Sequence, residues 1–194
     1  MSDANIVFLQ GFKTILRPLE KSTDLRLITM WQNNPANRTY VSHYLPQTMR
    51  REEEWFDKLG ASDADIQLAI VEKIGGNFIG MIGLHRIEWK NRVAAGGTFI
   101  GDIGYRDKGY GTDAKMTLLE YAFHELGLNK VNSAAFASNP RSIAYSMKCG
   151  YRVEGRRRQQ VFKNGRFGDI VELGVLRSEW EPIWRRWKKT GSVK

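Results

Sequence analysis

The sequence predicts an α/β fold, in which a mixed sheet carries helices on its faces. Apolar residues alternate through 78–89, which indicates a strand, whereas they recur at helical spacing through 116–126. Strand-like runs and helix-like runs of this kind alternate along the chain. The 194 residues, 42% hydrophobic and 26% charged, suit one folded domain. We expect that domain to span residues 1–194, with a core from about 11 to 187.

The first third of the chain is predicted to hold one strand and two helices, over residues 14–18, 22–31 and 50–59. Pro18 stops the strand, and Ser22 or Thr23 is the expected cap of the first helix. The polar and aromatic segment between the helices carries a turn signal at Asn33-Asn34-Pro35.

The middle of the chain turns to strands, over residues 66–72, 78–89 and 92–101. Gly75-Gly76-Asn77 is a turn between the first two. Gly96 and Gly97 in the third strand suggest a bulge or a close backbone approach.

The last part of the chain alternates between the two periods. A helix ending at Gly127 precedes a strand over 131–137, and a short helix follows over 139–149. Two further strands are expected at 151–155 and 169–176, on either side of a basic segment.

Charge and composition narrow the function. Lysine and arginine exceed the acids to give a net charge of +9, which attracts nucleic acid, an acidic membrane or a phosphate-rich small molecule. No apolar run is long enough to span a membrane, and the N-terminus lacks the features of a signal peptide. With a single cysteine, Cys149, this predicts a cytoplasmic protein. The three scattered histidines predict no metal site.

The strongest local signal is the loop Arg106-Asp107-Lys108-Gly109-Tyr110-Gly111, between a predicted strand and a helix. Glycines let successive backbone N–H groups converge on one anion, and the start of a helix adds unpaired N–H groups and a positive dipole. A pyrophosphate is the natural occupant. The spacing fails the Walker pattern, and a Rossmann loop would follow the first strand of its unit. A glycine-rich turn without a ligand is the alternative.

The loop resembles the Q/R-x-x-G-x-G/A coenzyme A loop of the GNAT superfamily of N-acetyltransferases. Phe99-Ile100-Gly101 stands where that family's cofactor strand splays and binds pantetheine. Asn139, Ser142 and Lys148-Cys149-Gly150-Tyr151 resemble its N-x-x-[AS]…K-x-G-[FY] segment. The tail over 161–169 is typical of a branch with the ribosomal-protein N-terminal-alanine acetyltransferases and, more distantly, spermidine acetyltransferases. The resemblance covers roughly residues 13 to 180.

The resemblance implies a mostly antiparallel sheet that is splayed at the cofactor strand. It implies acetyl-CoA as cofactor and direct transfer, in a ternary complex, to a primary amine of a small molecule or a protein N-terminus. The cofactor-binding residues it implies are Phe99, Ile100, Gly101, the six residues from Arg106 to Gly111, Asn139, Ser142 and Lys148.

The sequence departs from the family where acid and base are usual. Ser146 stands where many members have a tyrosine, and Tyr145, one position away, is expected to point elsewhere. Ala95 replaces a common glutamate.

By resemblance to the same branch, Glu88 is the candidate base and Ser142 the candidate acid. The alternatives are a surface glutamate and an ordinary first-turn serine. Trp31, Tyr40 and Tyr44 are expected to line the acceptor pocket or the core beneath it.

Two other functions compete with this interpretation. Arg156, Arg157, Arg158 and Lys163 interleave with aromatic residues, as in a nucleic-acid-binding strip, although family members often carry a basic strand pair there. A degenerate acetyltransferase that only senses acetyl-CoA is the other. The C-terminal tryptophans suggest core packing or a homodimer.

Overall fold

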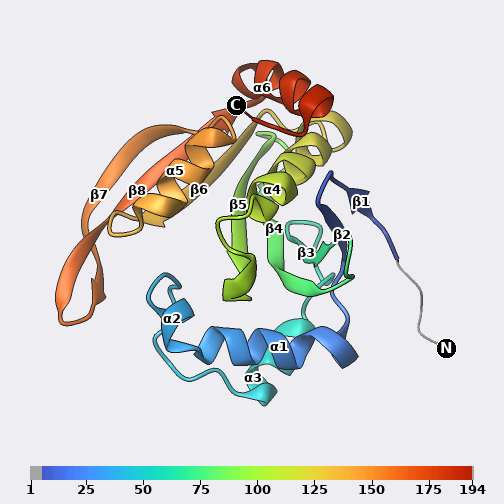
Figure 1. Cartoon of the computed structure of the whole chain (residues 1–194). Helices are drawn as coiled ribbons and strands as arrows, with labels where there is room; N and C mark the ends of the chain where they lie inside the picture. The colour runs from blue at the N-terminus through green and yellow to red at the C-terminus, as the bar shows by residue number, and fades with distance from the viewer. Residues whose placement is uncertain (1–5, 194) are drawn as a thin grey trace.

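The computed structural model describes residues 6–193 and contains one eight-stranded sheet in the order β1-β2-β3-β4-β5-β6-β8-β7 (Figure 1). The strands are β1 Leu9–Gln10, β2 Thr14–Pro18, β3 Ile66–Glu72, β4 Phe78–Glu88, β5 Val93–Ile100, β6 Lys130–Phe136, β7 Arg152–Lys163 and β8 Arg166–Leu176. Neighbouring strands are antiparallel except for β5 and β6, which are parallel. The mixed, mostly antiparallel sheet is confirmed.

The helices are α1 Lys21–Asn33, α2 Pro35–Arg38, α3 Met49–Phe56, α4 Tyr110–Glu120, α5 Pro140–Lys148 and α6 Arg177–Thr190. In Figure 1, α4 crosses one face of the sheet near β4 and β5, while α1 and α3 lie together beside the ends of those strands. Both faces of the central strands are buried. Leu68 and Ile82 share one face and Ala69 and Met81 share the other, as expected for a sheet with helices on both faces.

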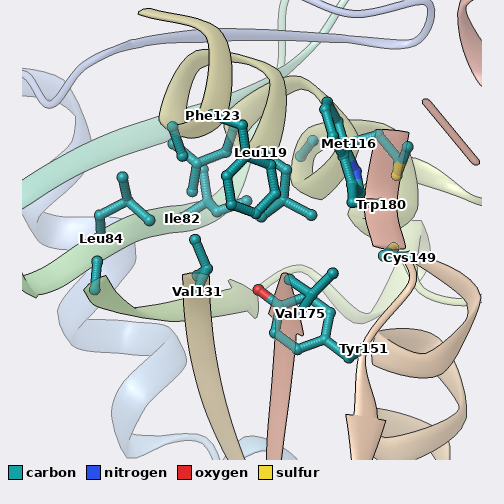
Figure 2. Packing of buried hydrophobic residues seen from close by; sticks show 14 of the residues in the cluster. Ile82, Leu84, Met116, Leu119, Phe123, Val131, Cys149, Tyr151, Val175 and Trp180 are labelled. Atoms are coloured by element: carbon teal, nitrogen blue, oxygen red, sulfur yellow. The ribbon is translucent and has the colours of Figure 1, made fainter. Parts of the chain in front are cut away.

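The main core fills the space between α4, α6 and one face of the sheet (Figure 2). Ile82, Val131, Leu119 and Phe123 are fully buried there, and Trp180 closes the cluster from α6. The tryptophans of α6 that suggested a dimer, Trp180 and Trp187, are 0% and 2% exposed, so they pack within the chain itself. No helix within residues 6–193 is long and apolar enough to cross a membrane.

Two local expectations were wrong. The first helix is not capped by Ser22 or Thr23: its N-cap is Glu20, whose N–H donates to the Asp24 carboxylate at 2.8 Å. Asp24 also pairs with Arg17 at 2.7 Å, so a buried acid in the first turn takes over the role of a cap.

The basic segment after residue 155 is not a separate connection, because β7 runs through it to Lys163. Asn164 and Gly165, both with positive φ, close a hairpin onto β8. An Asn-Gly pair suits the left-handed backbone that tight hairpins require. The helix α6 was not predicted, and it extends to Thr190, past the expected end of the core at about 187.

Candidate functional site

The sheet splits between its two parallel strands. The β5–β6 ladder contains only three pairs, Val93–Lys130, Ala94–Val131 and Ala95–Asn132. From Gly96 to Ile100, β5 stays paired with β4 but no longer with β6. Apart from the Ile100 carbonyl, which accepts from Arg106, the backbone along that edge is therefore free of β6 and can bind an extended ligand.

The loop that follows β5 forms an anion cradle. Asp107 and Gly109 adopt positive φ angles of 60° and 87°, and α4 begins directly afterwards at Tyr110. Among the described residues, no acceptor receives the six successive backbone N–H groups of residues 107–112. Unpaired N–H groups at the start of a helix are suited to bind phosphate.

A buried carboxylate fixes this end of α4. Asp113 accepts the backbone N–H groups of Phe12, Lys13 and Thr14 at 2.9–3.0 Å and the Thr14 hydroxyl at 2.7 Å. The contacts join α4 to β2 across about 100 residues of sequence, and sequence reasoning missed them. An acid in the first helical turn was the one local signal.

Cations surround the cradle. Lys13 reaches it from the N-terminal segment: its ammonium donates to the Lys108 carbonyl at 3.0 Å and would lie 3.5 Å from a Cβ on Gly109. The predicted acid at Asp107 is paired with Arg141 at 3.3 Å, which offsets its repulsion of phosphate. Sequence reasoning did not find Lys13, because nothing local links it to the loop.

Arg106 turns away from the cradle. Its guanidinium donates to the Ile100 carbonyl at 2.8 and 3.1 Å and to the Asn37 side chain, while Asn37 also donates to the Gly101 carbonyl at 3.0 Å. This network ties the loop and α2 to the end of β5. The predicted contact of Arg106 with the cofactor stays a prediction.

The predicted residues of α5 are only partly brought together. Asn139 caps the helix and accepts the Ser142 backbone N–H at 3.1 Å, while the Ser142 hydroxyl has no partner among the described residues. Lys148 is exposed at the opposite end of the helix, about 13 Å along its axis from Asn139 at 1.5 Å per residue. The structure therefore separates Lys148 from the cradle.

Tyr145 lies across the site, so the expectation that it points elsewhere was wrong. Its hydroxyl lies 3.0 Å from the Gly111 carbonyl and 3.1 Å from the Thr98 hydroxyl, which links α4 to the unpaired part of β5. Residues three apart on a helix share a face, so Tyr145 and Ser142 both face this region. Ser146 is instead buried towards the core.

A buried lysine lies beneath the split. Lys115 of α4 is 5% exposed and donates to the Ser146 hydroxyl at 3.0 Å. Its ammonium lies over the rings of Tyr145 and Tyr151, at 4.1 and 4.7 Å from their centroids. Burial lowers the pKa of Lys115 to about 8. Sequence reasoning missed it, because a lysine in an amphipathic helix is usually exposed.

A groove of about 570 Å³ opens between α2, the segment after it, the end of β6 and the tip of β7. It is lined by Pro35, Arg38, Thr39, Ser42, His43, Tyr44, Phe136, Val161, Phe162, Lys163 and Asn164. Tyr44 lines this groove but Tyr40 does not. Trp31 is half-buried; it packs on Phe78 and against Gly101 at the end of β5, and it does not line the groove.

Glu88 lies far from the cradle. It pairs with Val93 at the closed end of the split, and its carboxylate accepts from the Asn91 side chain at 2.7 Å. Along β4, Glu88 lies six positions from Ile82, the residue that pairs with Thr98. Six positions span about 20 Å at 3.3 Å per residue. The structure does not bring Glu88 and Ser142 together, and the role of Glu88 stays a prediction.

The basic strand is partly neutralised. Arg156 pairs with Asp169 at 2.6 Å and Arg157 with Glu172 at 3.0 Å, which weakens the case for a nucleic-acid strip.

Within residues 6–193, no cluster of His, Cys, Asp or Glu could hold a metal ion.

Comparisons with known proteins agree with this geometry. The profile of the family described as "Acetyltransferase (GNAT) domain" matches residues 13–152. The putative ribosomal N-acetyltransferase YdaF of Bacillus subtilis is 38% identical over 106 residues, which are 55% of this chain and only 57% of that protein. Spermidine N(1)-acetyltransferase of Vibrio cholerae is 28% identical over 165 residues, 85% of this chain and 94% of that protein.

Solved structures are similar as well. The crystal structure of spermidine N-acetyltransferase from Vibrio cholerae in complex with CoA and spermine superposes with a TM-score of 0.80 at 26% identity, covering 87% of this chain and 98% of that one. A dodecameric structure of the same enzyme in an intermediate state gives a TM-score of 0.74 at 26% identity, over 87% and 96% of the two chains.

Proposed function

Since the chain belongs to the GNAT acetyltransferase family, we propose that it transfers acetyl to a primary amine by direct attack in a ternary complex. The protein is an N-acetyltransferase that uses acetyl-CoA. The acceptor and the order of events are the proposed part.

The split in the sheet is the observation that supports a ternary complex. Ile100 packs towards Gly111 of α4, whereas Gly101, the next residue, packs against Trp31 of α1. Helix α4, which carries the cradle, and helix α1 therefore lie on opposite sides of the end of β5, and the groove is lined by α2, which follows α1 directly. Ligands on opposite faces of a sheet can meet only where the sheet is open, which is between Gly96–Ile100 and β6.

The residues fit acetyl-CoA. Six unpaired N–H groups and Lys13 would hold the pyrophosphate, and the edge of β5 that no longer pairs with β6, from Gly96 to Ile100, would hold the pantetheine arm. When bound, the cofactor supplies an activated acetyl thioester. The amine nitrogen bonds to the acetyl carbon while the carbon–sulfur bond breaks, the amine loses one proton and the sulfur gains one. The unpartnered Ser142 hydroxyl is the proposed donor to sulfur.

An acceptor screen tests this proposal. The protein is incubated with acetyl-CoA and a panel of primary amines that includes peptides, and the release of free thiol is followed together with the mass of the product. We expect stoichiometric release of thiol and formation of an amide. Tight binding of acetyl-CoA with no acetylated amine in any class would favour the sensor interpretation.

A homodimer also stays a proposal, to be tested by sedimentation.

A further inference from the structure

The groove beside α2 has a one-sided charge. Arg38 and Lys163 line it, His43 lies with them, and no aspartate or glutamate is among its lining residues. The Arg38 guanidinium makes no ion pair or hydrogen bond with any residue between 6 and 193. A guanidinium presents a planar fork of donors that matches a carboxylate or a phosphate.

Two contacts hold the Lys163 ammonium beside this groove. Its ammonium donates to the Val41 carbonyl and lies 4.9 Å from the centroid of the Phe136 ring. Burial and, after it, the charge of Arg38 lower the pKa of Lys163, and burial followed by the charge of Lys163 lowers that of His43. The three basic groups thus repel one another, with no carboxylate in the lining to offset them.

We propose that the acceptor amine carries an anionic group, a carboxylate or a phosphate, which binds Arg38 and Lys163 while the amine reaches the split through the groove. The inference rests on the proposed function and names its substrate class. It departs from the relatives named spermidine acetyltransferases, because a polycation would meet like charges here.

Four probes that share one terminal amine and a six-carbon chain, and differ only at the other end, test the class: aminohexanoate, aminohexyl phosphate, aminohexanamide and diaminohexane. Their binding to the CoA-saturated protein is measured by calorimetry, so that the result does not depend on turnover. We expect at least one anionic probe to bind about tenfold tighter than the amide, and the diamine to bind weakest, with a preference that falls as salt rises. The two anionic probes distinguish carboxylate from phosphate.

Arg38→Gln and Lys163→Gln should remove the preference and leave acetyl-CoA affinity unchanged. Arg158→Gln, on the same hairpin but outside the groove, is the matched control. Diamine binding equal to or tighter than that of both anions would overturn the acceptor class and leave acetyl transfer standing. If the unaltered protein did not bind acetyl-CoA, the proposed function itself would be overturned.

A different set of contacts supports a second inference, about the base. His85 pairs with Ala95 in the β4–β5 ladder, and Ala95 pairs with Asn132 of β6 at the last rung before the split. Paired residues share a face, and this is the face of Gly101 and Trp31, on the acceptor side. Gly97 leaves room for the imidazole, whose Nε2 would lie 3.7 Å from a Cβ there.

The polar groups around His85 and Asn132 would orient an imidazole that accepts a proton. His85 Nδ1 lies 3.3 Å from the carboxylate of Asp65, which also accepts the Arg86 N–H at 3.2 Å. The Asn132 side-chain oxygen is buried without a partner within the described residues. Such an orphaned oxygen is costly unless a ligand donates to it. The next charged groups on this face, Lys130 and Glu154, pair with each other at 2.8 Å.

We infer that His85 takes the proton of the acceptor amine, that Asp65 positions its ring, and that Asn132 accepts a second N–H of the same amine. An imidazole oriented through one nitrogen by a carboxylate presents the other as base. The loss of the usual glutamate at Ala95, directly opposite His85, leaves the imidazole as the nearest basic group on this face.

His85→Gln should lower kcat/KM by about 10²–10⁴-fold and remove the rise of activity with pH that an imidazole base produces. Asp65→Asn should have a smaller effect, and added imidazole should partly rescue His85→Gln but not Asp65→Asn. Glu88→Gln tests the competing assignment of the base. A large loss in Glu88→Gln, with a pH profile of His85→Gln like that of the unaltered protein, would refute the assignment.

Discussion

Replacing the buried Lys115 by methionine should change how stability depends on pH. Methionine has a similar length and carries no charge, so it fits the same space between Tyr145, Tyr151 and Ser146. Burial lowers the pKa of Lys115 from an ordinary 10.5 to about 8. In the folded protein at neutral pH, a charged ammonium is therefore kept out of water.

The size of the effect follows from linkage. One pKa unit is worth about 1.4 kcal/mol, so the change from 10.5 to about 8 amounts to about 3 kcal/mol. Between those two values the unfolded chain holds a proton that the folded chain does not. The contribution of Lys115 to the free energy of unfolding must therefore rise with pH through this window and stay constant below it.

Other buried groups oppose this trend. Burial raises the pKa of Cys149 from 9.0 to about 11 and raises that of Tyr151 as well, so both lower stability at high pH. These groups are present in both proteins and largely cancel in the difference between them. Urea unfolding of the two proteins at each pH gives that difference directly.

We expect Lys115→Met to be the more stable protein at neutral pH. Its advantage should shrink by about 3 kcal/mol as the pH rises from about 8 to 10.5. A difference that stays constant across this range would show that Lys115 is solvated in the folded protein, and would refute the reasoning.

Three further predictions concern the cradle and its supports. Gly109→Val places a β-branched residue at a φ of 87° and should abolish acetyl-CoA binding in calorimetry, whereas Gly60→Val, at a φ of 77° in an open turn, should retain it. Asp113→Asn weakens a carboxylate that accepts four hydrogen bonds; it should cost about 2–3 kcal/mol in urea unfolding, and an unchanged midpoint would contradict that role. Ser142→Ala should lower kcat while cofactor affinity stays constant, and an equal kcat would leave Ser142 as an ordinary first-turn residue.

Most elements could be predicted from the sequence, because their signals are local. The strand Ile66–Glu72 was predicted to the residue, from its short apolar run and the glycine turn after it. The loop 106–111 was identified from glycine spacing, which reflects the backbone angles that a cradle requires. The continuation of β7 was missed, because its arginines look solvated until their carboxylate partners on β8 are known.

The sequence by itself determined the family resemblance, the glycine loop at 106–111 and most of the order of strands and helices, since each depends on residues close together in the chain. Only the tertiary structure decided which groups meet around the split. Lys13 and Lys108, His85 and Asn132, and Arg38 and Lys163 come from segments far apart in sequence. The identity of a residue fixes its chemistry, but its partners are set by sheet order and strand register, which no short pattern encodes.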